Sequence, residues 1–112
     1  MLADVQAPDA IERGQLTYND YLQIPELLKL QVPQSEPAHH DEMLFIIIHQ
    51  AYELWFKLIL HELTQAICHM ETGEPLQAHH FISRVVEILR VLVKQIHLVE
   101  TMRPIDFLQF RH

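Results

Sequence analysis

Hydrophobic side chains recur at spacings of three and four along two long stretches of the chain, a spacing typical of amphipathic helices. No glycine or proline interrupts residues 38–72. The pattern therefore predicts one helix over about 39–71, roughly 45 Å long. Its apolar line consists of Phe45, Ile48, Tyr52, Trp55, Ile59, Leu63, Ala66 and Met70. Further apolar residues lie off this line, which predicts cover on more than one side: Leu44, Ile47, Leu54, Phe56 and Leu58.

A break at "TGEP" separates this stretch from the second one. Gly73 is typical of a residue just past a helix C-terminus, and Pro75 of a first helical position. The second helix is predicted over about 76–102, and Pro104 ends it. Its apolar line suits antiparallel packing on the first helix and comprises Ile82, Val85, Leu89, Leu92, Ile96 and Val99. Residues 105–112 resemble the start of another helix.

The N-terminal part predicts only short elements. Residues 1–15 are expected to form a flexible lead. Thr17 with Asp20 three residues later matches a capping box, so a short helix is predicted near Tyr18. Pro25 interrupts it and opens another turn or two, through Leu30. Alternating strand patterns are lacking, so the predicted class is all-α: two long antiparallel helices preceded by short ones.

Charge and composition narrow the functional classes. The 112 residues include 8 Lys and Arg against 15 Asp and Glu, a net charge of −7, which argues against a nucleic acid or an anionic membrane as partner. The longest apolar run has only about six residues, far below the roughly 20 that span a membrane. The single cysteine, Cys68, favours a reducing compartment and is expected to pack as a small hydrophobe.

The polar cluster "HHDE" at residues 39–42 has two interpretations. Glu36 and His39 have a spacing found in metal sites, and a His-rich metal-binding bundle using His39, His40, Glu53 and other histidines stays an alternative. The simpler interpretation is a polar helix N-terminus whose acids complement the helix dipole. The histidines elsewhere have no ligand-type spacing and are predicted to face solvent: His61, His69, His79, His80 and His97.

His49 also has two interpretations. It lies one turn before Glu53, which lies one turn before Lys57, so the three residues could form a salt-bridged polar seam. Phe45 lies one turn before His49 on the same face. A ring and an imidazole presented together could sandwich a planar ligand and hydrogen-bond its polar edge. The other aromatic residues of this helix, Tyr52, Trp55 and Phe56, are expected to be core.

Three strings take the interpretation further: "LTYNDYLQI", "SEPAHHDEMLFIIIHQAYELWFKLILHEL" and "LVETMRPIDFLQFR". Over residues 16–111 the chain resembles the tryptophan 2,3-dioxygenase family. The resemblance implies an all-α, haem-dependent, cytoplasmic, homotetrameric enzyme of tryptophan catabolism. Such enzymes add both atoms of O2 to L-tryptophan and give N-formylkynurenine, the entry to the kynurenine pathway. Residues 16–112 would then be the N-terminal segment of a single, incomplete domain.

The resemblance also implies roles for residues. Phe45 and His49 would form the distal face of a pocket for haem b, with His49 as the catalytic residue that hydrogen-bonds the indole N–H. The segment Phe45, Ile46, Ile47, Ile48 and His49 would contact the substrate, and Tyr18, Tyr21 and Leu22 would reach in from a neighbouring subunit. No metal ligand is expected within this chain, because the family's proximal haem histidine lies beyond residue 112. The chain alone is therefore expected to be inactive, and an inactive, self-associating helical hairpin stays the alternative.

Overall fold

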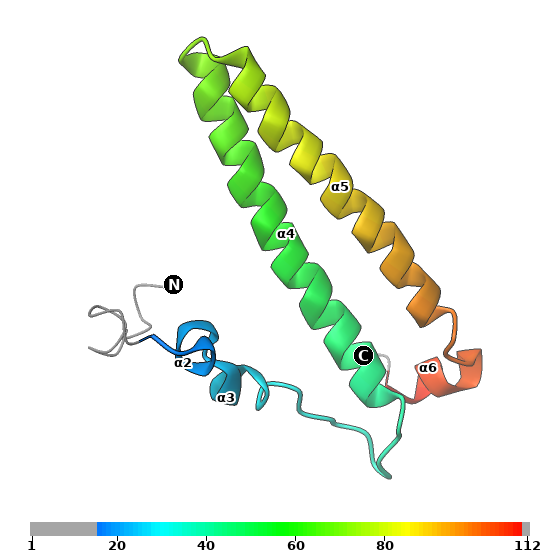
Figure 1. Ribbon diagram of the computed structural model, residues 1–112. Coiled ribbons are helices and arrows are strands. Elements are labelled where there is room, and N and C mark those ends of the chain that lie inside the picture. Colours follow the sequence, from blue (N-terminus) through cyan, green and yellow to red (C-terminus); the bar gives the residue numbers. More distant parts are fainter. Residues whose placement is uncertain (1–15, 111–112) are drawn as a thin grey trace. The chain divides into compact units, whose positions relative to one another are not determined.

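The computed structural model describes residues 16–110, which form helices and contain no strand (Figure 1). The predicted all-α class is confirmed. The helices are α2 (Tyr18–Leu22), α3 (Ile24–Leu27), α4 (Glu42–Glu71), α5 (Pro75–Val99) and α6 (Pro104–Phe110). The chain divides into two compact units between Val32 and Pro33. The predicted lead over 1–15 lies outside the described residues, and the assignment of one domain stays a prediction.

The first unit holds the two short helices. The Oγ1 of Thr17 accepts a hydrogen bond of 3.1 Å from the backbone N–H of Asp20, which confirms the predicted N-terminus of α2. Gln23 has a left-handed backbone (φ 54°) and separates α2 from α3. α3 ends at Leu27 and not at Leu30, because the N–H groups of Lys29 and Leu30 bond to carbonyls only three residues back. These tighter bonds close the helix early.

The second unit is a helical hairpin. α4 and α5 run antiparallel, side by side, and a short turn joins them (Figure 1). Gly73 follows the end of α4 with a φ of 76°, a backbone conformation that residues with a Cβ adopt at a cost. Pro75 is the first residue of α5. The turn signals read from the sequence are thus confirmed.

The line of buried residues differs from the predicted one over much of the hairpin. α5 faces α4 through Ala78, Val85, Ile88 and Leu92. The predicted Ile82, Leu89 and Ile96 are each more than two-fifths exposed. Both lines have helical spacing and apolar side chains, so periodicity alone could not choose between them.

The far half of α4 is also rotated from the prediction, and its inward face takes polar residues. Glu62 and Ala66 are buried, whereas Leu63 and Met70 are exposed. Two polar residues of this face have polar partners: Glu62 has one on α5, and His69 has one in the turn before α5. The carboxylate of Glu62 accepts a hydrogen bond of 3.2 Å from Arg84.

His69 and Cys68 correct two further expectations. The His69 ring is half-buried, stacks on Phe81 with centroids 5.5 Å apart, and places its Nδ1 2.9 Å from a carboxylate oxygen of Glu74. His69 therefore does not face solvent, contrary to the prediction. The hydrogen bonds from His69 and then Thr72 lower the pKa of Glu74, against desolvation. Cys68 is exposed rather than packed in the core.

The long helices also begin and end within a few residues of the predicted bounds. α4 begins at Glu42 rather than 39, because His39 bonds outside the helix, through its N–H to Ser35 and through its ring to Asp106. α5 ends at Val99 rather than 102, since the N–H groups of Thr101 and Met102 bond to carbonyls three residues back and the Met102 side chain is buried. The predicted further helix is confirmed as α6.

By length and composition, α4 could cross a membrane, although its longest apolar run is short. One such helix is weak evidence, because the core helix of a soluble protein passes the same test.

Candidate functional site

The rings of Phe45 and His49 lie together on the first two turns of α4. Their centroids are 4.3 Å apart and their planes are inclined at 37°. Phe45 is half-buried and His49 is exposed. The predicted sharing of one helix face is thus confirmed, and the two rings form a continuous surface of one apolar and one polar ring.

A hydrogen bond fixes the protonation pattern of His49. Its Nδ1 lies 2.7 Å from the backbone carbonyl oxygen of Phe45. A carbonyl oxygen only accepts, so Nδ1 carries the proton in this contact. In the neutral imidazole the lone pair then belongs to Nε2, which is the atom that can accept a hydrogen bond from a ligand.

The three isoleucines between these rings face different directions. Ile48 is 4% exposed and belongs to the core of the hairpin. Ile47 is exposed and Ile46 is half-buried. Of the predicted contact segment, therefore, Ile47 and His49 are exposed, Phe45 and Ile46 are half-buried, and Ile48 is buried. Glu53 and Lys57 are also exposed, as a solvent-facing polar side of α4 requires.

Tyr18, Tyr21 and Leu22 lie on α2, in the first unit. The Tyr18 side chain is 74% exposed, and the other two are exposed as well. Apolar and aromatic side chains held outward on a short capped helix are available to a partner. Their predicted role in a neighbouring subunit stays a prediction.

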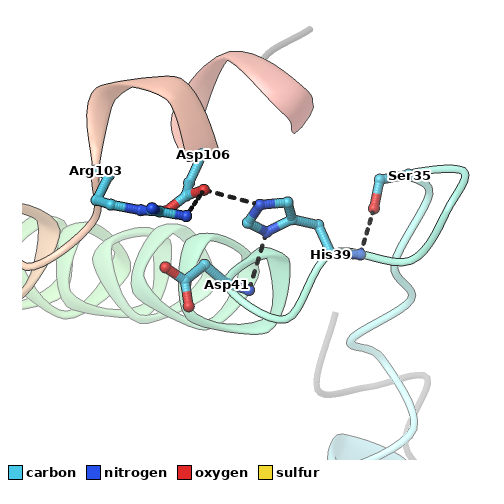
Figure 2. A network of polar contacts seen from close by, with 5 residues as sticks. All are labelled: Ser35, His39, Asp41, Arg103 and Asp106. Atoms are coloured by element: carbon cyan, nitrogen blue, oxygen red, sulfur yellow. Dashed lines mark hydrogen bonds and ion pairs between the residues drawn. The ribbon is translucent and has the colours of Figure 1, made fainter.

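A polar network joins the start of α4 to α6 (Figure 2). Asp106 is 5% exposed, and its carboxylate contacts both Arg103 (2.8 and 3.0 Å) and the Nε2 of His39 (3.0 Å). The guanidinium of Arg103, and then the His39 contact, lower the pKa of Asp106 against desolvation, which raises it. Asp106 in turn raises the pKa of Arg103.

The other nitrogen of His39 faces the start of α4. The backbone N–H of Asp41 donates to Nδ1 over 3.3 Å, and Ser35 Oγ accepts from the His39 N–H over 3.2 Å (Figure 2). Since Nδ1 accepts, the Nε2 that faces Asp106 carries the proton. His39 and His49 therefore hold opposite tautomers.

Glu42 ties the preceding loop to the same end of the helix. Its side chain is buried and accepts hydrogen bonds from the N–H of Gln34 (2.7 Å) and from both the N–H (3.0 Å) and the hydroxyl (2.6 Å) of Ser35. The expected polar helix N-terminus is present, but its side chains form hydrogen bonds with specific residues of the chain. Asp41, at the N-cap position, makes no side-chain cap bond.

The polar cluster does not form a metal site within residues 16–110. In that part of the chain no group of three or more His, Cys, Asp or Glu side chains could hold a metal ion. His40 and Glu53 are exposed, and His39 is engaged by Asp106. The alternative of a His-rich metal-binding bundle has no support here.

Sequence reasoning singled out His39 but missed its partner. Arg103 lies just before Pro104, the first residue of α6, and Asp106 follows Arg103 by three residues; this spacing was the only signal in the sequence. The contact from Asp106 to His39 spans 67 positions. Only the packing of α6 on α4 brings the two side chains together.

Comparisons with known proteins agree on one family. A family model described as Tryptophan 2,3-dioxygenase matches residues 3–112. The tryptophan 2,3-dioxygenase of Xanthomonas campestris pv. campestris is 49% identical over 98 residues, which cover 88% of this chain and 33% of the relative. That of a Nocardioides species is 52% identical over 105 residues, covering 89% of this chain and 39% of the relative. The chain thus spans about a third of the length of the curated relatives it matches.

Proposed function

The chain belongs to the tryptophan 2,3-dioxygenase family, and from this premise we propose that it supplies one wall of a tryptophan-binding haem pocket. The observation that carries the proposal is the Phe45–His49 ring pair at the start of α4. Its substrates would be L-tryptophan and O2, and its product N-formylkynurenine.

The exposed residues fit the wall of a site for flat, largely apolar groups. Ile47 and the accessible part of Phe45 offer apolar surface, and Ile48 on the same turn is buried in the hairpin core, which anchors this turn. Such a surface suits both an indole and the edge of a porphyrin. Haem b, when bound, would supply the iron chemistry that activates O2. We assign no iron ligand to this chain.

The role of His49 follows from its tautomer. With Nδ1 donating to the Phe45 carbonyl, Nε2 can accept the indole N–H of tryptophan. That contact would fix the rotation of the indole plane, and Phe45 would limit its tilt. The effect is positional, so the loss of one such contact would lower the rate by about 100-fold or less.

The proposal also covers how the subunits assemble and where in the cell the protein is located. Tyr18, Tyr21 and Leu22 on α2 would reach the pocket of a neighbouring subunit, in a homo-oligomer such as the family's tetramer. The exposed apolar side chains of α2 support an intersubunit role. A cytoplasmic location would suit the single free thiol, Cys68.

The test is turnover in the complete, haem-loaded protein. We expect His49→Ala to lower the conversion of L-tryptophan to N-formylkynurenine, measured by product absorbance, with an unchanged Soret band. His61→Ala is the control, because His61 is exposed on the same helix. Unchanged turnover in His49→Ala would contradict the role of His49. The 112-residue chain on its own is expected to give no turnover.

A second candidate is a non-enzymatic hairpin that only self-associates. The exposed apolar residues of α4 and α5, such as Leu60 and Leu76, favour it. It predicts an oligomer that forms without haem and does not respond to tryptophan. Sedimentation with and without haem and tryptophan separates the two candidates.

A further inference from the structure

We propose that His39 is a two-sided clamp that fixes the start of α4, and with it the Phe45–His49 pair, against α6. The assignment of a site to that pair rests on the function proposed above. The clamp itself rests on the contacts of His39 with Asp106 and with the Asp41 N–H.

The start of α4 needs such a device. The first N–H groups of any helix lack partners within the helix, and a side chain at the N-cap usually accepts from one of them. Asp41 makes no such bond. Instead, His39 Nδ1 accepts from the Asp41 N–H, and the His39 carbonyl accepts from the Glu42 N–H over 3.2 Å. His39 thus performs the capping from two positions before the N-cap.

The capped turn leads directly to the ring pair. The N–H of Phe45 donates to the carbonyl of Asp41 over 3.1 Å, and the carbonyl of Phe45 accepts from His49 Nδ1. Consecutive hydrogen bonds therefore connect the His39 ring to the His49 ring. Fraying of the first turn would break the bond from the Phe45 N–H to the Asp41 carbonyl and loosen Phe45, whose own carbonyl orients His49.

The other side of the His39 ring holds α6. Asp106 is buried, and Arg103 grips the same carboxylate with two nitrogens. Arg103 lies just before α6, and His39 lies just before α4. The imidazole therefore lies between two helix starts and bonds to each through a different nitrogen (Figure 2).

Two conservative substitutions can separate the two sides of the clamp. The side-chain oxygen of asparagine can occupy the place of a histidine Nδ1, whereas the amide nitrogen of glutamine can reach the place of Nε2. His39→Asn should therefore keep the cap on α4 and lose the bond to Asp106. His39→Gln should keep the bond to Asp106 and lose the cap.

The measurement is amide hydrogen exchange, residue by residue, on the protein as it exists. We expect His39→Gln to speed exchange of the Phe45 amide about tenfold and to leave α6 unchanged. His39→Asn should speed exchange in α6 and leave Phe45 unchanged, and His39→Ala should speed both. Glu87→Gln is the control, because it breaks only an exposed ion pair with Arg90 on α5. Identical patterns in the asparagine and glutamine variants would overturn the clamp.

Tryptophan affinity tests the link to the ring pair. In the complete, haem-loaded protein, His39→Gln should weaken tryptophan binding about threefold or more, and more than His39→Asn does. Equal affinities in the two variants, with the exchange patterns as expected, would overturn the positioning role. If the unaltered protein bound no tryptophan, the proposed function would fail, and the exchange patterns would still decide whether His39 is a clamp.

Discussion

Two histidines ten positions apart use their ring nitrogens in opposite ways. His39 donates from Nε2 to Asp106 and accepts at Nδ1, whereas His49 donates from Nδ1 to the Phe45 carbonyl. The first ring is enclosed by protein partners on both nitrogens, and the second keeps Nε2 as an acceptor on an exposed face. The same residue type therefore suits a structural role in one place and the proposed ligand binding in the other.

The Asp106 carboxylate should make stability depend on pH in the acid range. Its pKa is lowered, first by Arg103 and then by His39. A lowered pKa in the folded state means that the stabilisation is present above the unfolded value of about 3.9 and is lost as the pH falls through the folded value. Asp106→Asn should therefore reduce the free energy of unfolding more at pH 6 than at pH 3. Urea titrations at both values measure this, and a difference independent of pH would contradict it.

At the scale of elements, the sequence predicted where the helices turn, but it did not predict which of their faces would pack together. Gly73 and Pro75 fixed the turn, because each has a local conformational preference. Which side of α5 would be buried depended on α4. Ile82 and Ile88 are equally apolar, and only packing decides that Ile88 is buried.

Polar residues in the interface explain the rest of the difference. Glu62 displaces Leu63 from the buried line because Arg84 on α5 meets its carboxylate. A rule that places leucine inside and glutamate outside misses such pairs. The ring pair was predictable because Phe45 and His49 are one turn apart, whereas Asp106 could reach His39 only through the tertiary fold.

The Glu62–Arg84 pair should stabilise the hairpin only as a pair. Arg84→Met leaves the Glu62 carboxylate buried without its guanidinium, at a cost of about 1–3 kcal/mol in unfolding free energy. Adding Glu62→Leu should recover most of that loss, because an apolar pair of similar volume avoids burying a charge. Urea denaturation measures both. Arg90→Met, an exposed change on the same helix, is the control, and equal losses in Arg84→Met and Arg90→Met would contradict this account.

At the scale of the molecule, the hairpin leaves many large apolar side chains exposed. Leu54, Leu60, Met70 and Leu76 are each more than half exposed. Burying apolar surface is the main favourable term in protein association. The proposed homo-oligomer would provide that burial.

A charge on this surface should therefore disturb assembly and leave the fold intact. Leu60→Lys is expected to shift the protein to smaller species in sedimentation velocity at equal concentration, with unchanged helix content by circular dichroism. Gln77→Lys, an exposed polar position on α5, should leave the assembly as it is. A well-folded monomer for the unaltered protein would contradict the proposed assembly.

The central claim is that His49 accepts the indole N–H of tryptophan, and one measurement tests it directly. It compares the affinity of the complete, haem-loaded protein for L-tryptophan and for 1-methyl-L-tryptophan, which lacks that N–H, in the unaltered protein and in His49→Ala. One lost hydrogen bond is worth about 1 kcal/mol, or somewhat less than tenfold in affinity. We predict that the unaltered protein prefers L-tryptophan by at least about that factor and that His49→Ala loses most of the preference. The same preference in both proteins would contradict the claim.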